Sequence, residues 1–128
     1  MPNYWYDHVH LVSPAPLETA HFYEKMFSAE RVSTTELADG RTSVVLDLNG
    51  SSIRVIDRQA QAEPAPSETG YGLGHFGIIT DDLEAAVAEL KINGVQFRED
   101  IRVVGPKRKT SFLWGPENVL IELVERSG

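Results

Sequence analysis

The chain has 128 residues, the size of one typical domain or of two half-domains that share a core. Its 41% hydrophobic and 24% charged residues are ordinary for a globular protein, and the net charge of −7 argues against a nucleic-acid-binding surface. The sequence has no apolar run near the roughly 20 residues of a membrane span, no evident signal peptide and no cysteine. We therefore expect a cytoplasmic protein with neither a nucleic-acid nor a membrane partner.

The first half is predicted to form one strand, one helix and three more strands. Alternating, β-rich residues from Tyr6 onward indicate the first strand, and Pro16 suits the first turn of the helix. Asp39-Gly40 and Asn49-Gly50 are hairpin-turn signals between the later strands. The predicted elements are a strand over 6–13, a helix over 17–27, and strands over 30–37, 41–48 and 51–57.

The second half is predicted to follow the same βαβββ order after a polar, proline-containing linker. Asp81 or Asp82 caps the helix, and Asn93-Gly94 ends it with residues that tolerate a left-handed conformation. The predicted segments are a linker over 59–73, a strand over 74–80, a helix over 83–92, and strands over 96–104, 110–114 and 119–125.

The two halves repeat one another in sequence. Tyr6 to Ser13 (YDHVHLVS) aligns with Leu73 to Thr80 (LGHFGIIT) at an offset of 67 residues, so His8 falls on His75. The closing strands align at an offset of 68 residues (IRVIDR with IELVER), which matches Arg54 with Glu122. If the halves pair about a pseudo-two-fold axis, these four side chains converge.

Strand alternation supports this convergence. Successive side chains of a strand point to opposite faces of the sheet. The apolar neighbours of His8, Arg54, His75 and Glu122 are expected to face the helices, so the four matched side chains leave the sheet on its other face. A carboxylate among apolar neighbours, such as Glu122, must be paired, protonated or bound to a metal.

Longer motifs identify a family. The first half carries DHVHLVS and HFYEKMF, and the second carries GHFGIITDDLEAAVAELKINGVQF and FLWGPENVLIELVE. Over roughly Tyr6 to Arg126 the chain resembles the vicinal oxygen chelate superfamily, which includes glyoxalase I, methylmalonyl-CoA epimerase, extradiol ring-cleavage dioxygenases and bleomycin-resistance proteins. The resemblance implies an α+β fold in which tandem βαβββ modules, 6–58 and 74–126, form a curved, partly open mixed sheet. It also implies a homodimer.

The resemblance implies a metal site as well. In these enzymes the histidine that opens each half and the glutamate of the closing IEL motif are metal ligands, and here they are His8, His75 and Glu122. Glyoxalase I and the epimerase usually have a fourth ligand, glutamate or glutamine, at the position of Arg54. Arginine stays protonated and offers no acceptor, so it cannot bind a cation.

The remaining set of two histidines and one carboxylate indicates which metals are suitable. It matches the facial triad of non-haem Fe(II) enzymes, among them the extradiol dioxygenases. It is also compatible with catalytic Zn²⁺ and with Mn²⁺. We favour Fe²⁺, with the three ligands contributed by one chain or by two.

Two residues are candidates for catalysis near the metal. Arg54 is interpreted as binding an anionic substrate oxygen, with an ion pair to Glu122 or Asp47 as the alternative. His10 shares the strand face of His8 and is a candidate general base, with a packed histidine as the alternative.

Three more residues are candidates for binding substrate. Lys107 and Arg108 belong to a basic run that is suited to an anionic group, although such a run is also typical of a solvated loop. Trp114 is a candidate for a cavity wall, or else packs as an ordinary core aromatic. We expect a small metal-dependent enzyme acting on a small oxygen-chelating substrate by dioxygenase-like or lyase/isomerase chemistry. The alternative is a metal-free ligand-binding protein similar to bleomycin-resistance proteins.

Overall fold

The chain forms two compact units, Met1–Glu63 and Pro64–Gly128. The computed structural model describes residues 3, 6–57 and 73–127 of them. The predicted linker over 59–73 lies outside the described residues, apart from an exposed Leu73. Among the described helices, neither is long and apolar enough to cross a membrane.

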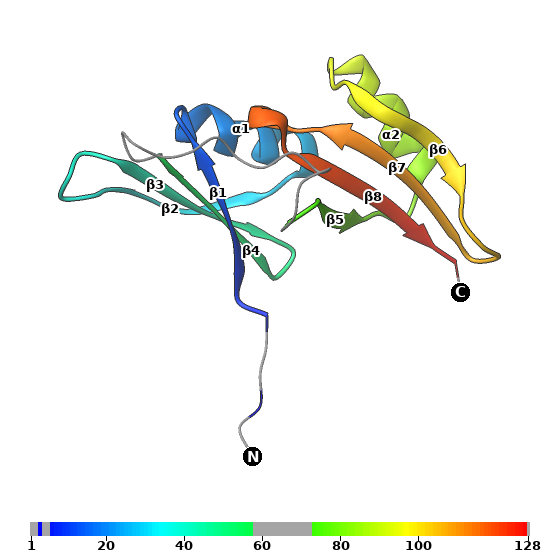
Figure 1. Cartoon of the computed structure of the whole chain (residues 1–128), viewed down its shortest axis with the longest axis horizontal. Coiled ribbons are helices and arrows are strands. Elements are labelled where there is room, and N and C mark those ends of the chain that lie inside the picture. The colour runs from blue at the N-terminus through cyan, green and yellow to red at the C-terminus, as the bar shows by residue number, and fades with distance from the viewer. Residues whose placement is uncertain (1–2, 4–5, 58–72, 128) are drawn as a thin grey trace. The chain divides into compact units, whose positions relative to one another are not determined.

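The first unit is a four-stranded mixed sheet with one helix on one face (Figure 1). The strand order is β1-β4-β3-β2, with β1 parallel to β4 and the other neighbours antiparallel. The helix packs against β1, β3 and β4. The elements are β1 (His8–Ser13), α1 (Pro16–Phe27), β2 (Glu30–Glu36), β3 (Thr42–Leu48) and β4 (Ser51–Asp57).

Local sequence explains where these elements begin and end. Pro16 occupies the first turn of α1, where its missing N–H costs no hydrogen bond, and Ser28 ends the helix in a left-handed conformation. Gly50 supplies the positive φ that the tight β3–β4 turn requires. The core between α1 and the sheet contains the fully buried residues Ala20, Tyr23, Val44, Leu46 and Val55.

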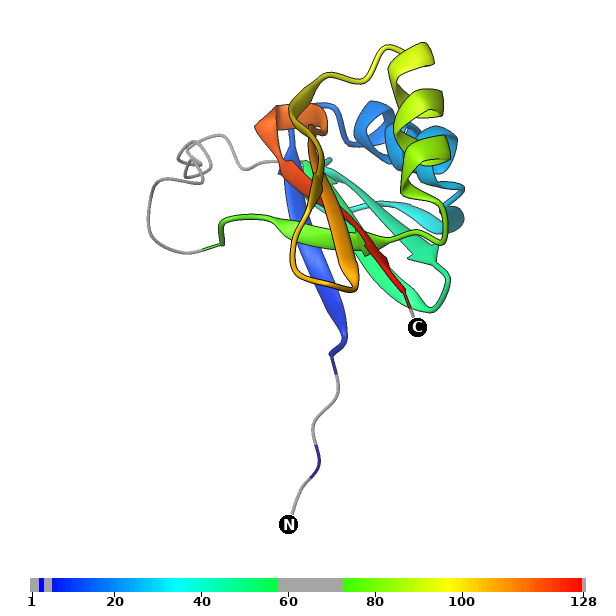
Figure 2. The same cartoon turned by 90° about the vertical axis from the view of Figure 1, so that its right-hand side faces the viewer.

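The second unit has the same architecture, with α2 lying along its sheet (Figure 2). Asp82 caps α2 by accepting a hydrogen bond from the N–H of Ala85, which confirms one of the two predicted caps. The strand order is β5-β8-β7-β6, with β5 parallel to β8. The elements are β5 (Phe76–Ile79), α2 (Leu83–Ile92), β6 (Phe97–Val103), β7 (Arg108–Trp114), a 3-10 turn η1 (Pro116–Asn118) and β8 (Leu120–Arg126).

The predicted α+β fold of two βαβββ modules is confirmed. Some boundaries differ from the prediction. The first strand begins at His8 rather than Tyr6, and β7 begins at Arg108 rather than Thr110, because Arg108 still pairs with Arg126 of β8. The 3-10 turn before β8 was not predicted.

Strand register confirms the repeat and adds one correspondence. In the parallel pair of the first unit His10 lies beside Arg54, and in the second unit Gly77 lies beside Glu122. Because Arg54 and Glu122 are matched by the repeat, Gly77 takes the place of His10. The second unit therefore has no side chain where the first has an imidazole.

Candidate functional site

In the first unit the candidate metal ligand His8 is held by a neighbouring carboxylate. The Nδ1 of His8 lies 2.6 Å from Oδ2 of Asp7, close enough for a short hydrogen bond. This hydrogen bond is the main cause that lowers the pKa of Asp7; desolvation opposes it, and the charges of His8 and Arg54 add to it. In the neutral form with its proton on Nδ1, His8 would keep a lone pair on Nε2, the arrangement of histidines that bind metals.

Arg54 and His10 lie next to this pair. Arg54 is half-exposed, and its Nη2 is 3.8 Å from Oδ2 of Asp7, an ion pair that differs from the predicted alternatives. Asp47, one of those alternatives, instead accepts a hydrogen bond from the N–H of Gly50 in the β3–β4 turn. Partial desolvation is the largest cause that lowers the pKa of the exposed His10, and the positive charges of a protonated His8, of Arg54 and of Arg41 add to it. A neutral His10 has the acceptor nitrogen that a general base needs.

In the second unit the candidate ligands His75 and Glu122 face each other. Nε2 of His75 lies 3.5 Å from Oε1 of Glu122, with the glutamate side chain 21% exposed. Two ligand atoms bound to one tetrahedral ion are about 3.4 Å apart, given metal–ligand distances of about 2.1 Å. The spacing of the two donor atoms is therefore compatible with coordination of one tetrahedral ion. Gly77 leaves this side open, since a Cβ there would lie 3.7 Å from Oε1 of Glu122.

An aromatic ring and an arginine that sequence reasoning missed complete this region. Phe112 of β7 lies directly opposite Glu122 of β8, and its ring meets that of His75 edge to face at 5.1 Å. The guanidinium carbon of Arg98 lies 4.9 Å from the centre of the same ring. Antiparallel pairing of the last two strands would have indicated Phe112. No sequence signal indicated Arg98.

Trp114 and the basic run occupy opposite ends of β7. Trp114 is half-buried and pairs with Leu120, two residues beyond Phe112 on the same face. Arg108 pairs with Arg126 at the other end, four residues along the strand from Phe112, or about 13 Å at the usual rise per residue. The basic run therefore reaches only the distant part of an extended ligand bound at Glu122.

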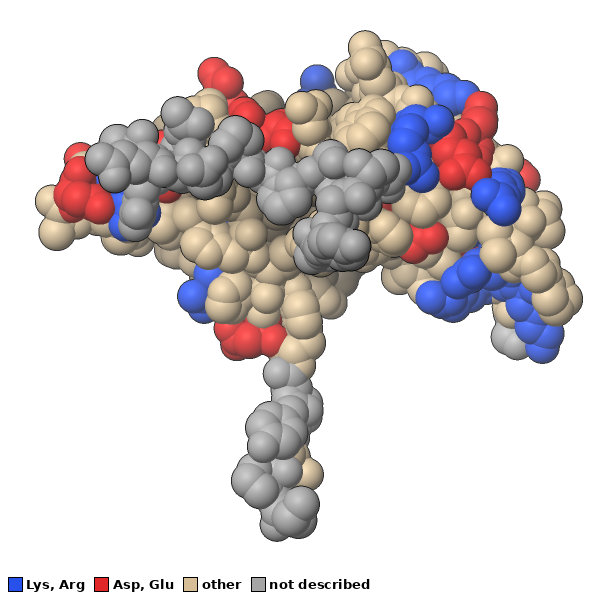
Figure 3. Space-filling model, in the orientation of Figure 1, with Lys and Arg blue, Asp and Glu red and all other residues tan. Residues whose placement is uncertain are grey.

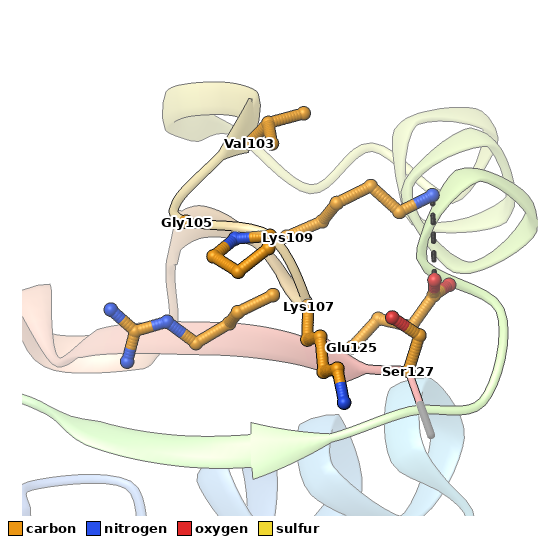
Figure 4. Close-up of a pocket in the computed structure, with 8 residues that line it drawn as sticks. Val103, Gly105, Lys107, Lys109, Glu125 and Ser127 are labelled. Carbon is orange, nitrogen blue, oxygen red and sulfur yellow. Dashed lines mark ion pairs between the residues drawn. The ribbon is translucent and has the colours of Figure 1, made fainter.

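The side chains of the basic run point in different directions. Lysine and arginine side chains gather at the end of the β6–β7 hairpin (Figure 3). A shallow cavity lies beside this end of the hairpin (Figure 4). There Nζ of Lys109 lies 3.4 Å from the carboxylate of Glu125, whereas Lys107 points away from that pair. Lys109 also pairs with Glu84, and these two hydrogen-bonded carboxylates raise its pKa. Lys109 thus links α2 to β8 through two ion pairs.

Each unit by itself supplies a histidine and a carboxylate. Within either unit, the described residues include no group of three His, Asp or Glu side chains gathered closely enough to hold a metal ion. The donor types present, imidazole nitrogen and carboxylate oxygen, nevertheless suit a divalent transition metal.

Comparison with a family model decides the family. Residues 5–123 match the model described as the Glyoxalase/Bleomycin resistance protein/Dioxygenase superfamily. The chain belongs to this superfamily. The resemblance drawn from the motifs is thereby confirmed. No curated protein matches the sequence.

Solved structures of superfamily members have the same fold. A glyoxylase/bleomycin resistance protein/dioxygenase domain from a Frankia species is 16% identical with a TM-score of 0.81, over 98% of this chain and 100% of its own. A glyoxalase family protein from Enterococcus faecalis is 22% identical with a TM-score of 0.80, over 94% and 97% of the two chains. A mutant of the fosfomycin resistance protein FosX from Listeria monocytogenes, complexed with Mn(II) and 1S,2S-dihydroxypropylphosphonic acid, is 16% identical with a TM-score of 0.72, over 97% and 92%.

Proposed function

We propose that this member of the superfamily is a metal-dependent enzyme in which His8, His75 and Glu122 bind one divalent ion. The observation that carries the proposal is the 3.5 Å approach of His75 Nε2 to Glu122 Oε1 on a half-buried strand face. The short hydrogen bond of His8 to Asp7 supports it, because it leaves Nε2 available as a ligand atom. The three ligands belong to one chain or to two copies of it.

Two imidazoles and one carboxylate suit Fe²⁺ best, and Zn²⁺ and Mn²⁺ remain candidates. The complex of FosX with Mn(II) supports including manganese in any test. When bound, such a metal supplies either Lewis-acid stabilisation of negative charge on substrate oxygen or, as iron, activation of dioxygen.

The residues of the chain divide the remaining tasks. Neutral His10 accepts a proton from the bound substrate, and Arg54 holds an anionic substrate oxygen with its planar fork. Trp114 borders the reacting groups, and Lys107 and Arg108 contact the distant end of a larger substrate. The substrate is a small organic molecule that offers two neighbouring oxygen atoms. The reaction is a dioxygenase-like or a lyase/isomerase step, carried out by a cytoplasmic homodimer.

A metal-free ligand-binding protein is the second candidate function. Arg54 favours it, because a cation at the position of the usual fourth metal ligand repels a nearby metal ion. The pair between Arg54 and Asp7 opposes it, since the carboxylate neutralises that charge locally.

Metal content distinguishes the two functions. Elemental mass spectrometry of anaerobically purified wild type is expected to give close to one ion for each set of His8, His75 and Glu122. The control His21→Ala should give the same value, because the His21 side chain is exposed on α1. His75→Ala and Glu122→Ala are expected to lose the ion while keeping the same circular dichroism. Iron rather than zinc would support dioxygen chemistry. A wild type that stays metal-free after reconstitution with Fe²⁺, Mn²⁺ and Zn²⁺ would contradict the enzyme function and favour ligand binding.

A further inference from the structure

Each unit has a pair of like charges at the end of its sheet, and the two pairs are opposite in sign. In the first unit Glu30 of β2 lies directly opposite Asp47 of β3. In the second unit Arg108 of β7 lies directly opposite Arg126 of β8. Like charges directly opposite each other on antiparallel strands destabilise a sheet. Each pair therefore leaves a local charge that an opposite charge from a partner would compensate.

Neither pair is compensated among the residues that the structure describes. Glu30, Arg108 and Arg126 are exposed, and none of them forms an ion pair with another described residue. The partly exposed Asp47 accepts a hydrogen bond from the backbone N–H of Gly50, which carries no charge. The charges of both pairs therefore remain open to a charged partner.

Both pairs leave their sheets on the face away from the helix. Asp47 follows Leu46, which is buried in the core beneath α1, and Lys109, which follows Arg108, pairs with Glu84 of α2. Because side chains alternate along a strand and cross-strand partners share a face, neither helix covers the two pairs. Directly opposite residues have Cβ atoms about 4.5–5.5 Å apart. Two carboxylates and two guanidiniums at this matching spacing can form two parallel ion pairs.

The charge of the rest of the chain favours a second copy as the partner. The net charge is −7, and residues 1–63 contain nine acidic and five basic residues. Lysine and arginine side chains nevertheless gather at the end of the β6–β7 hairpin, where Lys107 adjoins Arg108 (Figure 3). The basic end of one copy is therefore complementary to the acidic first unit of another. Each copy carries both pairs, so a two-fold axis forms the contact twice.

We propose that the Arg108–Arg126 pair of one copy binds the Glu30–Asp47 pair of a second copy, so that two reciprocal charge contacts hold a homodimer together. The inference rests on the homodimer of the proposed function and is independent of the metal site. It assigns Arg108 to the partner copy in place of the distant end of a substrate. Contacts between exposed charges are weak and are screened by salt, so the dimer is expected to dissociate as ionic strength rises.

Exchange of charge between the two pairs provides the test. One double variant, Arg108→Glu with Arg126→Glu, makes all four positions acidic. The other, Glu30→Arg with Asp47→Arg, makes all four positions basic. Each variant keeps a pair of like charges where wild type has one, so the sheet is expected to retain its stability. Circular dichroism and thermal midpoints check the fold of both.

Analytical ultracentrifugation of the metal-free proteins measures dimer affinity at low (about 0.05 M) and high (about 0.5 M) NaCl. Glu18→Arg with Glu36→Arg is the matched control for the basic variant. It changes the net charge by the same amount at two exposed positions of the first unit. An effect that follows from net charge alone would therefore appear in both.

Wild type is expected to form dimers whose dissociation constant rises about tenfold or more between the two salt concentrations. Each charge-exchanged variant alone should bind itself at least about tenfold more weakly, because like charges then meet in both contacts. An equimolar mixture of the two variants should recover the wild-type affinity to within about threefold, because each contact again joins opposite charges. The control should also stay within about threefold of wild type.

A monomeric wild type, a dimer that neither variant weakens, or a mixture without recovery would each overturn the inference. Monomeric wild type that binds a hexaglutamate peptide through Arg108 and Arg126 would assign the basic pair to a different acidic protein. A dimer that ignores the charge exchange would remove this contact and leave the proposed homodimer in place. The metal content of the protein, measured separately, decides the metal site whichever result is found.

Discussion

Asp7 and His8 form the shortest histidine–carboxylate contact of the candidate site, with Oδ2 2.6 Å from Nδ1. In a neutral His8 whose proton lies on Nδ1, this contact would leave the Nε2 lone pair free to bind a metal. In the second unit the carboxylate of Glu122 instead faces Nε2 of His75. In the proposed metal site the two carboxylates would have different roles: Asp7 would orient a ligand, and Glu122 would itself be a ligand.

Asp7→Ala is expected to weaken metal binding about tenfold. Removing a carboxylate that orients a ligand histidine typically weakens metal binding by about 10- to 100-fold, and we expect the lower end of that range because Asp7 is 79% exposed. Calorimetric titration with Zn²⁺ measures the change. Asp81→Ala, which removes an exposed carboxylate just before α2, serves as the control. Equal Zn²⁺ affinities for wild type and Asp7→Ala would remove the orienting role of Asp7.

Gly77→Val is expected to separate stability from metal binding. Valine is favoured in strands, and the backbone of Gly77 is not in the left-handed region, so the thermal midpoint should stay the same or rise. The added methyl groups extend from a Cβ position 3.7 Å from Oε1 of Glu122 and obstruct the open side of the carboxylate. Zn²⁺ affinity should fall at least tenfold, with Gly77→Ala in between. An unchanged affinity would show that the ion approaches from another side.

Trp114 should report on ligands at the candidate site. It lies two residues from Phe112 on the same strand face, about 7 Å along the strand. The chain has two tryptophans, so Trp5→Phe leaves Trp114 as the single emitter. Oxalate, a chelator with two oxygens, should shift or quench the emission of the Zn²⁺-loaded protein. If Trp114→Phe, which retains Trp5, responds equally, Trp114 does not border the site.

Tyr23 makes stability sensitive to alkali. Burial against the first sheet raises its pKa well above the ordinary value, because the phenolate would be desolvated. The unfolded phenol ionises near pH 10, so this contribution to stability is complete below about pH 10 and is lost as pH rises further. Urea unfolding from pH 8 to pH 11 should show a smaller decline for Tyr23→Phe than for wild type. Parallel declines would exclude Tyr23 as the cause.

Much of the fold could be predicted from sequence because its signals are local. Asp39-Gly40 and Asn49-Gly50 mark turns that the structure contains, and Pro16 marks the start of α1. The side of the sheet taken by Glu122 was predicted from alternation, and its 3.5 Å approach to His75 is consistent with that side. The nearness of His75 to Glu122 then follows from parallel pairing of β5 with β8.

The parts that sequence missed depend on irregular backbone. Asp7 contacts both His8 and Arg54 because β1 begins only at His8, which leaves Asp7 outside the ladder. Arg98 contacts the ring of Phe112 beside a bulge in β6. The sequence of β6 has no turn residue and no break in alternation that would predict this bulge. Arg108 was left outside the predicted strand over 110–114. In the structure it pairs with Arg126, and the length of a strand depends on its partner strand, which cannot be read from one segment of sequence.

The most direct test of the central claim is X-ray absorption spectroscopy of the Zn²⁺-loaded protein, which counts imidazole ligands on the bound ion. Two imidazoles and at least one oxygen are expected for wild type, and any Zn²⁺ that excess loading retains in the weakly binding variants His8→Ala and His75→Ala should have at most one imidazole. His10→Ala, which removes the next histidine on the same strand face, should keep two. Fewer than two imidazoles in wild type, or an unchanged spectrum in His8→Ala, would contradict a shared metal site built from His8, His75 and Glu122.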